Sequence, residues 1–162
     1  MEKDLTIHST SGVYVLVLFL RKDTMLTVGK LGTHKFLGGF YTYTGSALGK
    51  GAAGLKQRVA RHLRAEKRNF WHIDYLIENE DVSVEAIVVA ETSKDLECVL
   101  NGFLRGVGGE VVVEGFGASD CGNRCGSHLL HFPSVDSVDC LVSKVVDYLR
   151  SAASVRSVEV VR

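Results

Sequence analysis

The sequence predicts an α/β (α+β) fold, in which helices flank a small, mostly antiparallel central sheet. Short apolar runs rich in β-branched residues alternate along the chain with segments of helical period. Their order, β-β-β-α-β-α-β-α, is typical of an α/β or α+β sandwich. The chain has 162 residues, of which 46% are hydrophobic and one is proline. We therefore expect one domain over residues 1–162, which ends in a helix at 138–150.

The N-terminal part of the chain is expected to supply most of the sheet. The run 13–20 is apolar at both parities, which predicts a strand buried on both faces. Residues 26–30 and 34–40, with glycines between them, predict a hairpin. Residues 41–44 predict a further strand, on which Tyr41 and Tyr43 share one face.

Helices dominate the rest of the chain. The segment 71–77 fits either a short helix or an extended connection. Ser93 occupies the N-cap position of the helix expected at 95–104. The other expected elements are helices at 55–66, 95–104 and 138–150, strands at 84–90 and 111–113, and a loop at 115–125.

Composition and charge exclude several classes of protein. An apolar chain with 19 Lys and Arg against 19 Asp and Glu is not expected to be disordered. No apolar run approaches the roughly 20 residues of a membrane span, and residues 1–10 contain no signal-peptide core, so no membrane partner is expected. Four cysteines in such a chain favour free thiols in a reducing compartment. The sequence thus predicts a cytoplasmic protein.

A basic segment crosses the helix expected at 55–66. At 100° per residue, Leu55, Val59 and Leu63 form its buried stripe. Arg58 and His62 lie at one edge of that stripe, where partial desolvation is costly unless something pairs with them. The other bases point further into solvent: Arg61, Arg64 and Arg68, with Lys67 beside them. This pattern fits a phosphate-binding face, and it also fits a solvated helix face with arginine stems lying on apolar surface.

Several blocks in chain order carry a family resemblance. They are Gly12-Val13-Tyr14, Tyr43-Thr44-Gly45-Ser46-Ala47, Arg58 to Arg64, Trp71 to Leu76, Glu97-Cys98, Gly115 to Cys121 and Ser127-His128-Leu129. Together they resemble the GIY-YIG nuclease family over residues 12–132. The chain as a whole looks like a prokaryotic subfamily found alone or fused to endonuclease III-type repair glycosylases.

The resemblance implies a metal-dependent DNA endonuclease that hydrolyses phosphodiester bonds, with a role in DNA repair. It implies Mg²⁺ or Mn²⁺ as cofactor, DNA as substrate and a repair glycosylase as a further partner. The alternative is a non-catalytic nucleic-acid-binding module on the same fold. Arg61, Arg64, Lys67 and Arg68 project away from the proposed site edge, so they are expected to contact DNA phosphates. His72, beside Trp71, fits a contact with DNA, and it also fits core or hydrogen-bonded surface.

The same resemblance gives five residues a catalytic role. Tyr14 and Tyr43 would orient or deprotonate the attacking water, which requires a nearby cation to lower a phenol pKa from its usual value near 10. Arg58 would neutralise charge on the phosphate, and His62 would donate a hydrogen bond or carry a second proton. Glu97 would hold the metal ion.

The sequence departs from the family pattern at three places, one of which is a longer loop from Gly45 to Arg58. Residues 20–40 insert extra structure between the two tyrosines. The asparagine that often completes the site late in such chains has no clear counterpart, although Asn101 and Asn123 are candidates. Asp120 or His128 would then have to replace it.

Cysteine and histidine crowd into one segment of the sequence. Cys121, Cys125, His128 and His131, with Cys98 as a further candidate, are soft ligands of the kind that hold structural zinc. Their spacing matches no common zinc module. Buried free cysteines are the ordinary alternative.

Overall fold

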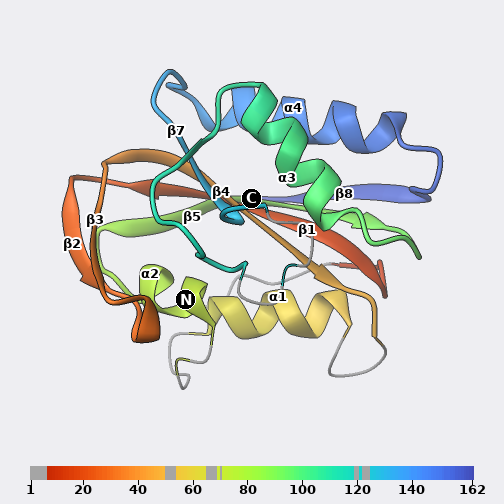
Figure 1. Cartoon of the computed structure of the whole chain (residues 1–162). Coiled ribbons are helices and arrows are strands. Elements are labelled where there is room, and N and C mark those ends of the chain that lie inside the picture. The colour runs from red at the N-terminus through yellow and green to blue at the C-terminus, as the bar shows by residue number, and fades with distance from the viewer. Residues whose placement is uncertain (1–6, 50–53, 65–68, 70, 119–120, 122–124) are drawn as a thin grey trace.

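A six-stranded antiparallel sheet lies between two layers of helices (Figure 1). The computed structural model describes residues 7–49, 54–64, 69, 71–118, 121 and 125–162. The sheet has the strand order β6-β7-β4-β1-β5-β8, and β2 pairs with β3 in a separate two-stranded sheet. Every neighbouring pair is antiparallel. The predicted α+β class, with an antiparallel central sheet flanked by helices, is confirmed.

The elements follow the chain in a simple order. The strands are β1 (Gly12–Leu20), β2 (Thr24–Thr27), β3 (Thr33–Phe36), β4 (Gly39–Ala47), β5 (Val82–Glu91), β6 (Glu110–Val111), β7 (Leu129–Phe132) and β8 (Ser157–Val161). The helices are α1 (Leu55–Leu63), α2 (His72–Ile77), α3 (Glu97–Gly106) and α4 (Val138–Ser151), with a 3-10 turn, η1 (Gly29–Leu31), between β2 and β3.

Strand β1 lies at the centre of the sheet and separates two hydrophobic cores. Tyr14, Leu16 and Leu18 point into one core, which α1 and α2 cover. Val13 and its alternate neighbours point into the other core, under α3 and α4. Side chains of a strand alternate between faces, so an apolar run at both parities needs a cover on each side. The predicted doubly buried strand is confirmed.

Gly45 on β4 lies directly opposite Tyr14 on β1. A Cβ atom at position 45 would lie 2.4 Å from both Cζ and the hydroxyl oxygen of Tyr14. The Tyr14 ring therefore occupies the space above Gly45 that a side chain would fill. This close approach directs the phenol along the α1 face of the sheet.

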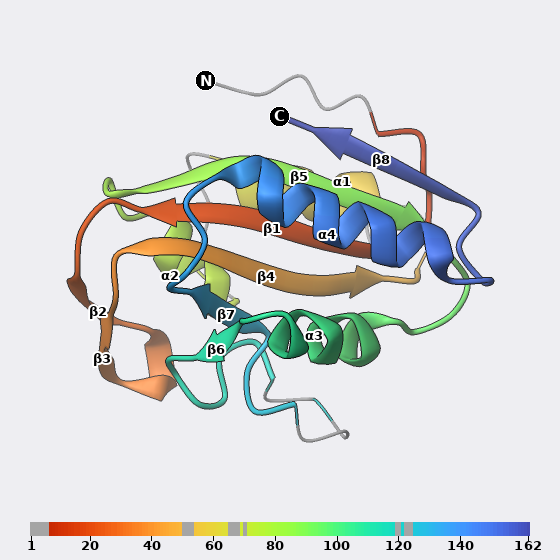
Figure 2. The same ribbon diagram turned by 90° about the horizontal axis from the view of Figure 1, so that it is seen from above.

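The predicted hairpin forms, but it stands apart from the main sheet. β2 and β3 pair with each other at the end of the sheet where β1 finishes and β4 begins (Figure 2). The strand expected at 34–40 is broken, because β3 stops at Phe36 and β4 starts at Gly39. Gly39 has a φ of +125°, a conformation that residues with a side chain rarely adopt.

Other boundaries differ from the predictions. The segment 71–77 is helical, since α2 spans His72–Ile77. The Ser93 cap is wrong, because α3 begins at Glu97 after a turn in which the Thr92 hydroxyl accepts the Lys94 N–H. Two strands were not predicted: β7, which pairs with β4, and the edge strand β8, which pairs with β5. Among the described residues, none of the helices has the length and apolar character that a bilayer crossing requires.

Candidate functional site

The five side chains predicted to be catalytic come from β4 and from three elements that pack against it. They are Tyr14 of β1, Tyr43 of β4, Arg58 and His62 of α1, and Glu97 of α3. Their roles stay predictions, but the structure brings them together.

A hydrogen bond joins the two elements at the centre of this cluster. The Tyr14 hydroxyl lies 2.8 Å from His62 Nε2, and both residues are buried. The ring of Tyr43 stands edge-on to the same imidazole, with 6.2 Å between ring centroids. His62 lies three residues after Val59, about one helical turn away. Its ring therefore faces the sheet beside the buried stripe of α1.

Asp74 lies behind His62, on the side away from Tyr14. Its fully buried carboxylate has Oδ1 3.6 Å from His62 Nδ1 and Oδ2 3.1 Å from Arg61 Nη1. The backbone N–H of Trp71 also donates to Oδ2, at 2.9 Å. A buried carboxylate requires such partners, because burying an unpaired charge is very costly.

The expectation that Arg61 points into solvent is therefore wrong. Helical periodicity places it outside the apolar stripe, but α2 packs beside α1 and brings Asp74 within reach of its guanidinium. Its side chain is 27% exposed. A DNA contact by Arg61 would have to compete with, or share, this ion pair.

The remaining DNA contacts that were predicted have different surroundings. Arg64 is exposed at the end of α1. Lys67 and Arg68 lie outside the described residues. His72 Nδ1 accepts the backbone N–H of Gly117 at 2.8 Å, and its ring packs on Phe116, so this histidine holds Phe116 and Gly117 in place.

Arg58 is held at the rim of the cluster. Its guanidinium carbon lies 5.0 Å from the centre of the Trp71 ring, and its Nη1 donates to the backbone carbonyl of Ser46 at 3.3 Å. These contacts fix the side chain beside the Tyr14 hydroxyl before any ligand arrives. Arg58 is partly exposed, so it presents a positively charged surface to solvent.

Glu97 lies at the first turn of α3, beside the C-terminal end of β4. Its Oε2 accepts a hydrogen bond from the Ser46 hydroxyl at 2.9 Å, and its Oε1 lies 2.8 Å from His128 Nδ1. Its side chain is 22% exposed. Ser46 thus touches both charged residues of the cluster, Glu97 through its hydroxyl and Arg58 through its carbonyl.

Burial controls the protonation of the central pair. It raises the pKa of Tyr14 well above its usual value, and neighbouring Tyr43 and Glu97 raise it further, while Arg58 lowers it. Burial also raises the pKa of Tyr43 and lowers that of His62, although Asp74 partly offsets the latter. Arg58 lowers the Tyr14 pKa, as the predicted role of this phenol requires, but desolvation outweighs its effect. At neutral pH the phenol therefore donates to a neutral His62.

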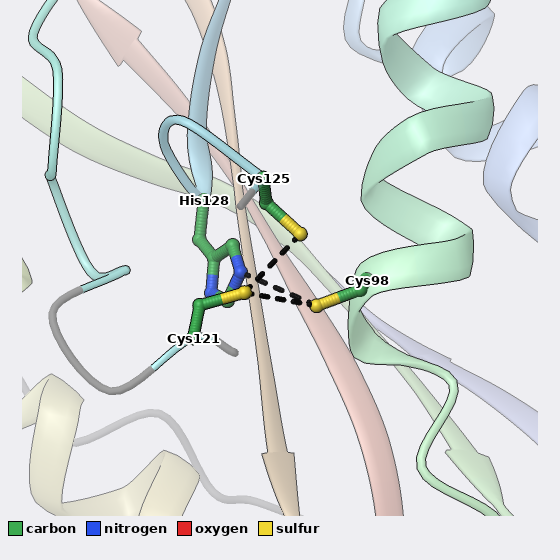
Figure 3. Close-up of side chains that lie close together, drawn as sticks. All are labelled: Cys98, Cys121, Cys125 and His128. Carbon is green, nitrogen blue, oxygen red and sulfur yellow. Dashed lines mark hydrogen bonds between the residues drawn. The ribbon is translucent and has the colours of Figure 1, made fainter. Parts of the chain in front are cut away.

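A second cluster contains Cys98, Cys121, Cys125 and His128 (Figure 3). Their ligand atoms all lie within 4.8 Å of one another, an arrangement that could hold a metal ion. Burial and the neighbouring thiols raise the pKa of Cys125, so without a cation the thiol stays protonated.

His131 is not part of this second cluster, contrary to the sequence-based expectation. It lies on β7, where its ring packs against Tyr41 and its Nε2 contacts the Gly38 carbonyl. Asn101 does not complete the first cluster either, since its buried amide donates to the Ser127 carbonyl. Asn123 and Asp120 lie outside the described residues.

Sequence reasoning missed two residues of the site, Ser46 and Asp74. Both lie inside blocks that carried the resemblance, yet neither had a role there. Asp74 also had a local signal, because an acid at the third position of a helix often accepts the N-cap backbone N–H. Ser46 offered no such signal.

The comparisons with known proteins give one match. The family described as "Domain of unknown function DUF123" matches residues 13–160. No curated protein and no solved structure matches the chain. Since the matched residues span almost the whole sequence, the chain belongs to the DUF123 family.

Proposed function

We propose that this protein is a metal-dependent endonuclease that hydrolyses phosphodiester bonds in DNA, with a role in repair. The hydrogen bond between Tyr14 and His62, with Arg58 beside it, is the observation that supports this proposal most strongly. The resemblance to GIY-YIG nucleases singles out these three residues together with Tyr43 and Glu97.

The Tyr14–His62 pair supplies a route for the proton of the attacking water. His62 Nε2 accepts from the phenol, and Asp74 lies behind Nδ1. As the phenol oxygen takes a proton from water, the phenol proton can pass to His62, and Asp74 stabilises the imidazolium that forms. This relay needs no free phenolate, so it tolerates the raised pKa of Tyr14.

Arg58 supplies positive charge for the phosphate. Its planar guanidinium offers several donors in a fixed fork, and one donor contacts the Ser46 carbonyl. The Trp71 ring supports its face. A cation held in advance stabilises charge that develops in the transition state without further reorganisation.

Glu97 is the protein ligand that we propose for Mg²⁺. Each of its carboxylate oxygens has one partner, Ser46 or His128, and retains a second lone pair. Mg²⁺ often binds one or two carboxylates and completes its coordination with water and substrate phosphate, which one partly exposed glutamate can satisfy. The ion would polarise the scissile phosphate and assist the departing oxygen.

A second candidate function is nucleic-acid binding without cleavage. The burial of Tyr14, Tyr43 and His62 favours it, because a catalytic group must reach its substrate. In that case Arg58 and the exposed Arg64 would bind DNA phosphates without any cleavage.

One assay separates the two functions. Supercoiled plasmid is incubated with the pure protein and Mg²⁺, then with EDTA, and finally with Mg²⁺ or Zn²⁺ restored separately. We expect nicking that EDTA abolishes and Mg²⁺ restores, whereas Zn²⁺ alone does not. A gel shift without nicking would replace the proposal by the binding module, and a protein that neither binds nor nicks DNA would exclude both.

Arg64→Ala is expected to weaken DNA binding without changing the chemistry. One lost phosphate contact lowers the slope of log affinity against log salt by about 0.9. The cutting rate at saturating DNA should stay close to that of the wild type, because uniform binding affects KM rather than kcat. Fluorescence anisotropy over a salt series measures the slope.

Arg150→Ala is the matched control for Arg64→Ala. Arg150 is exposed at the last turn of α4, on the opposite face of the sheet. It should leave the slope unchanged. Equal slopes for the wild type and Arg64→Ala would remove Arg64 from the DNA-binding face.

A further inference from the structure

We propose that Cys98, Cys121, Cys125 and His128 together bind one Zn²⁺ ion, and that Glu97 positions the histidine ligand. Cys98 lies on α3, Cys121 and Cys125 lie in the segment between β6 and β7, and His128 immediately precedes β7. Among the described residues, this is the one group in which three or more metal-binding side chains gather.

The distances between ligand atoms suit tetrahedral zinc. Cys98 Sγ lies 3.2 Å from Cys121 Sγ and 3.9 Å from His128 Nε2, and Cys121 Sγ lies 3.3 Å from Cys125 Sγ. Zinc with bonds of about 2.3 Å to sulfur would place neighbouring sulfur ligands about 3.8 Å apart, so the two short sulfur–sulfur distances need only a small increase. Three thiolates and an imidazole favour zinc over Mg²⁺ or Ca²⁺, which prefer oxygen.

The orientation of His128 is a second, independent observation. Its Nδ1 lies 2.8 Å from Glu97 Oε1, and its Nε2 faces the sulfur atoms. Two lone pairs would repel at that distance, so Nδ1 carries a proton, and Nε2 is the ring nitrogen that can bind a metal in the cluster. A carboxylate behind the ring is the arrangement that orients many metal-binding histidines. The Ser46 hydroxyl in turn fixes Glu97.

Zinc at this position would anchor the segment that covers Tyr43. That segment includes Gly117, where a Cβ would lie 2.8 Å from Tyr43 Cε2. One metal ion would fasten this segment to α3 and to the start of β7. The zinc is thus structural, and Glu97 links it through Ser46 to Arg58.

The test measures zinc in the full chain, purified without a histidine tag and without chelators. We expect about one zinc per chain by mass spectrometry of the metal, and a loss of more than about tenfold in Cys98→Ser and His128→Ala. Cys140→Ser is the matched control, because Cys140 is a half-buried cysteine on α4 outside the cluster. It should keep its zinc.

A variant that fails to fold would lose zinc for an unrelated reason, so a second measurement uses the wild type. Its zinc is removed, and the protein is then titrated with Co²⁺. Tetrahedral thiolate ligation gives an intense visible spectrum with sulfur-to-cobalt charge transfer. A pale octahedral spectrum, a zinc-free wild type with four reactive thiols, or a disulfide between Cys98 and Cys121 would each overturn the proposal. So would equal loss of zinc in Cys140→Ser.

Glu97→Gln tests the positioning role, with Glu91→Gln as its control. We expect zinc affinity to fall about 10-fold to 100-fold in Glu97→Gln and to stay unchanged in Glu91→Gln. Unchanged affinity in both would remove Glu97 from the zinc site. Zinc content is measured independently of DNA cleavage. If the protein binds zinc but does not cut DNA, only the nuclease proposal is contradicted. If it cuts DNA but contains no zinc, only the zinc proposal is contradicted.

Discussion

Tyr14→Phe is expected to reduce DNA cutting by about 10²-fold to 10⁴-fold at saturating substrate, the usual effect of removing a proton-transfer group. The variant keeps the ring that packs over Gly45, but it removes the hydroxyl that meets His62 Nε2. It also leaves a buried imidazole nitrogen without this partner, which costs about 1–3 kcal/mol of stability. Single-turnover cleavage measures the first effect and urea unfolding the second.

Tyr41→Phe is the matched control for Tyr14→Phe. Tyr41 lies in the same hydrophobic core, and its buried hydroxyl donates to the Leu37 carbonyl, far from the Tyr14–His62 pair. This control should lose comparable stability and keep its cutting rate. If both variants lose the same activity, the loss reflects stability, and the proposed role of Tyr14 as a proton carrier is incorrect.

Asp74→Ala is expected to have the largest effect on stability, about 3–5 kcal/mol, because it removes one partner of a buried ion pair. The change leaves the Arg61 guanidinium, the His62 imidazole and the Trp71 N–H without their carboxylate. It therefore loosens both α1 and the start of α2. Urea unfolding followed by circular dichroism measures the change in midpoint.

Asp139→Ala provides the comparison for Asp74→Ala. Asp139 pairs with Arg162, but both side chains are largely exposed, and exposed pairs contribute little. Its unfolding midpoint should stay near that of the wild type. A small effect of Asp74→Ala, similar to that of the control, would show that other groups satisfy Arg61 and His62.

Local patterns were enough to predict the centre of the fold. The run 13–20 could only be a doubly buried strand, and the stripe of Leu55 and Val59 set the orientation of α1. The short strands β7 and β8 were missed, because four or five residues carry too little pattern to compete with the loops around them. Their pairing partners lie far away in the sequence.

The missed strand explains the error in the second cluster. Spacing alone suggested His131 as a ligand, but β7 pairs it with Tyr41, so its ring lies on the same face of the sheet as Tyr41 and away from the thiols. Cys98 takes that place because α3 passes beside the Cys121 segment. Likewise, no helical wheel of α1 could reveal that α2 brings Asp74 to Arg61 and His62. Contacts between elements decided both cases.

Gly45 has a consequence for how this sequence can change over time. Its backbone is not in the left-handed region, so the position requires glycine because of the Tyr14 ring and not because of its own conformation. Positions 14 and 45 therefore form a pair in which only one member can be large. A lineage that lost the tyrosine would release position 45 to drift toward ordinary strand residues. A glycine that is retained at position 45 therefore indicates selection for the tyrosine at position 14 on the neighbouring strand.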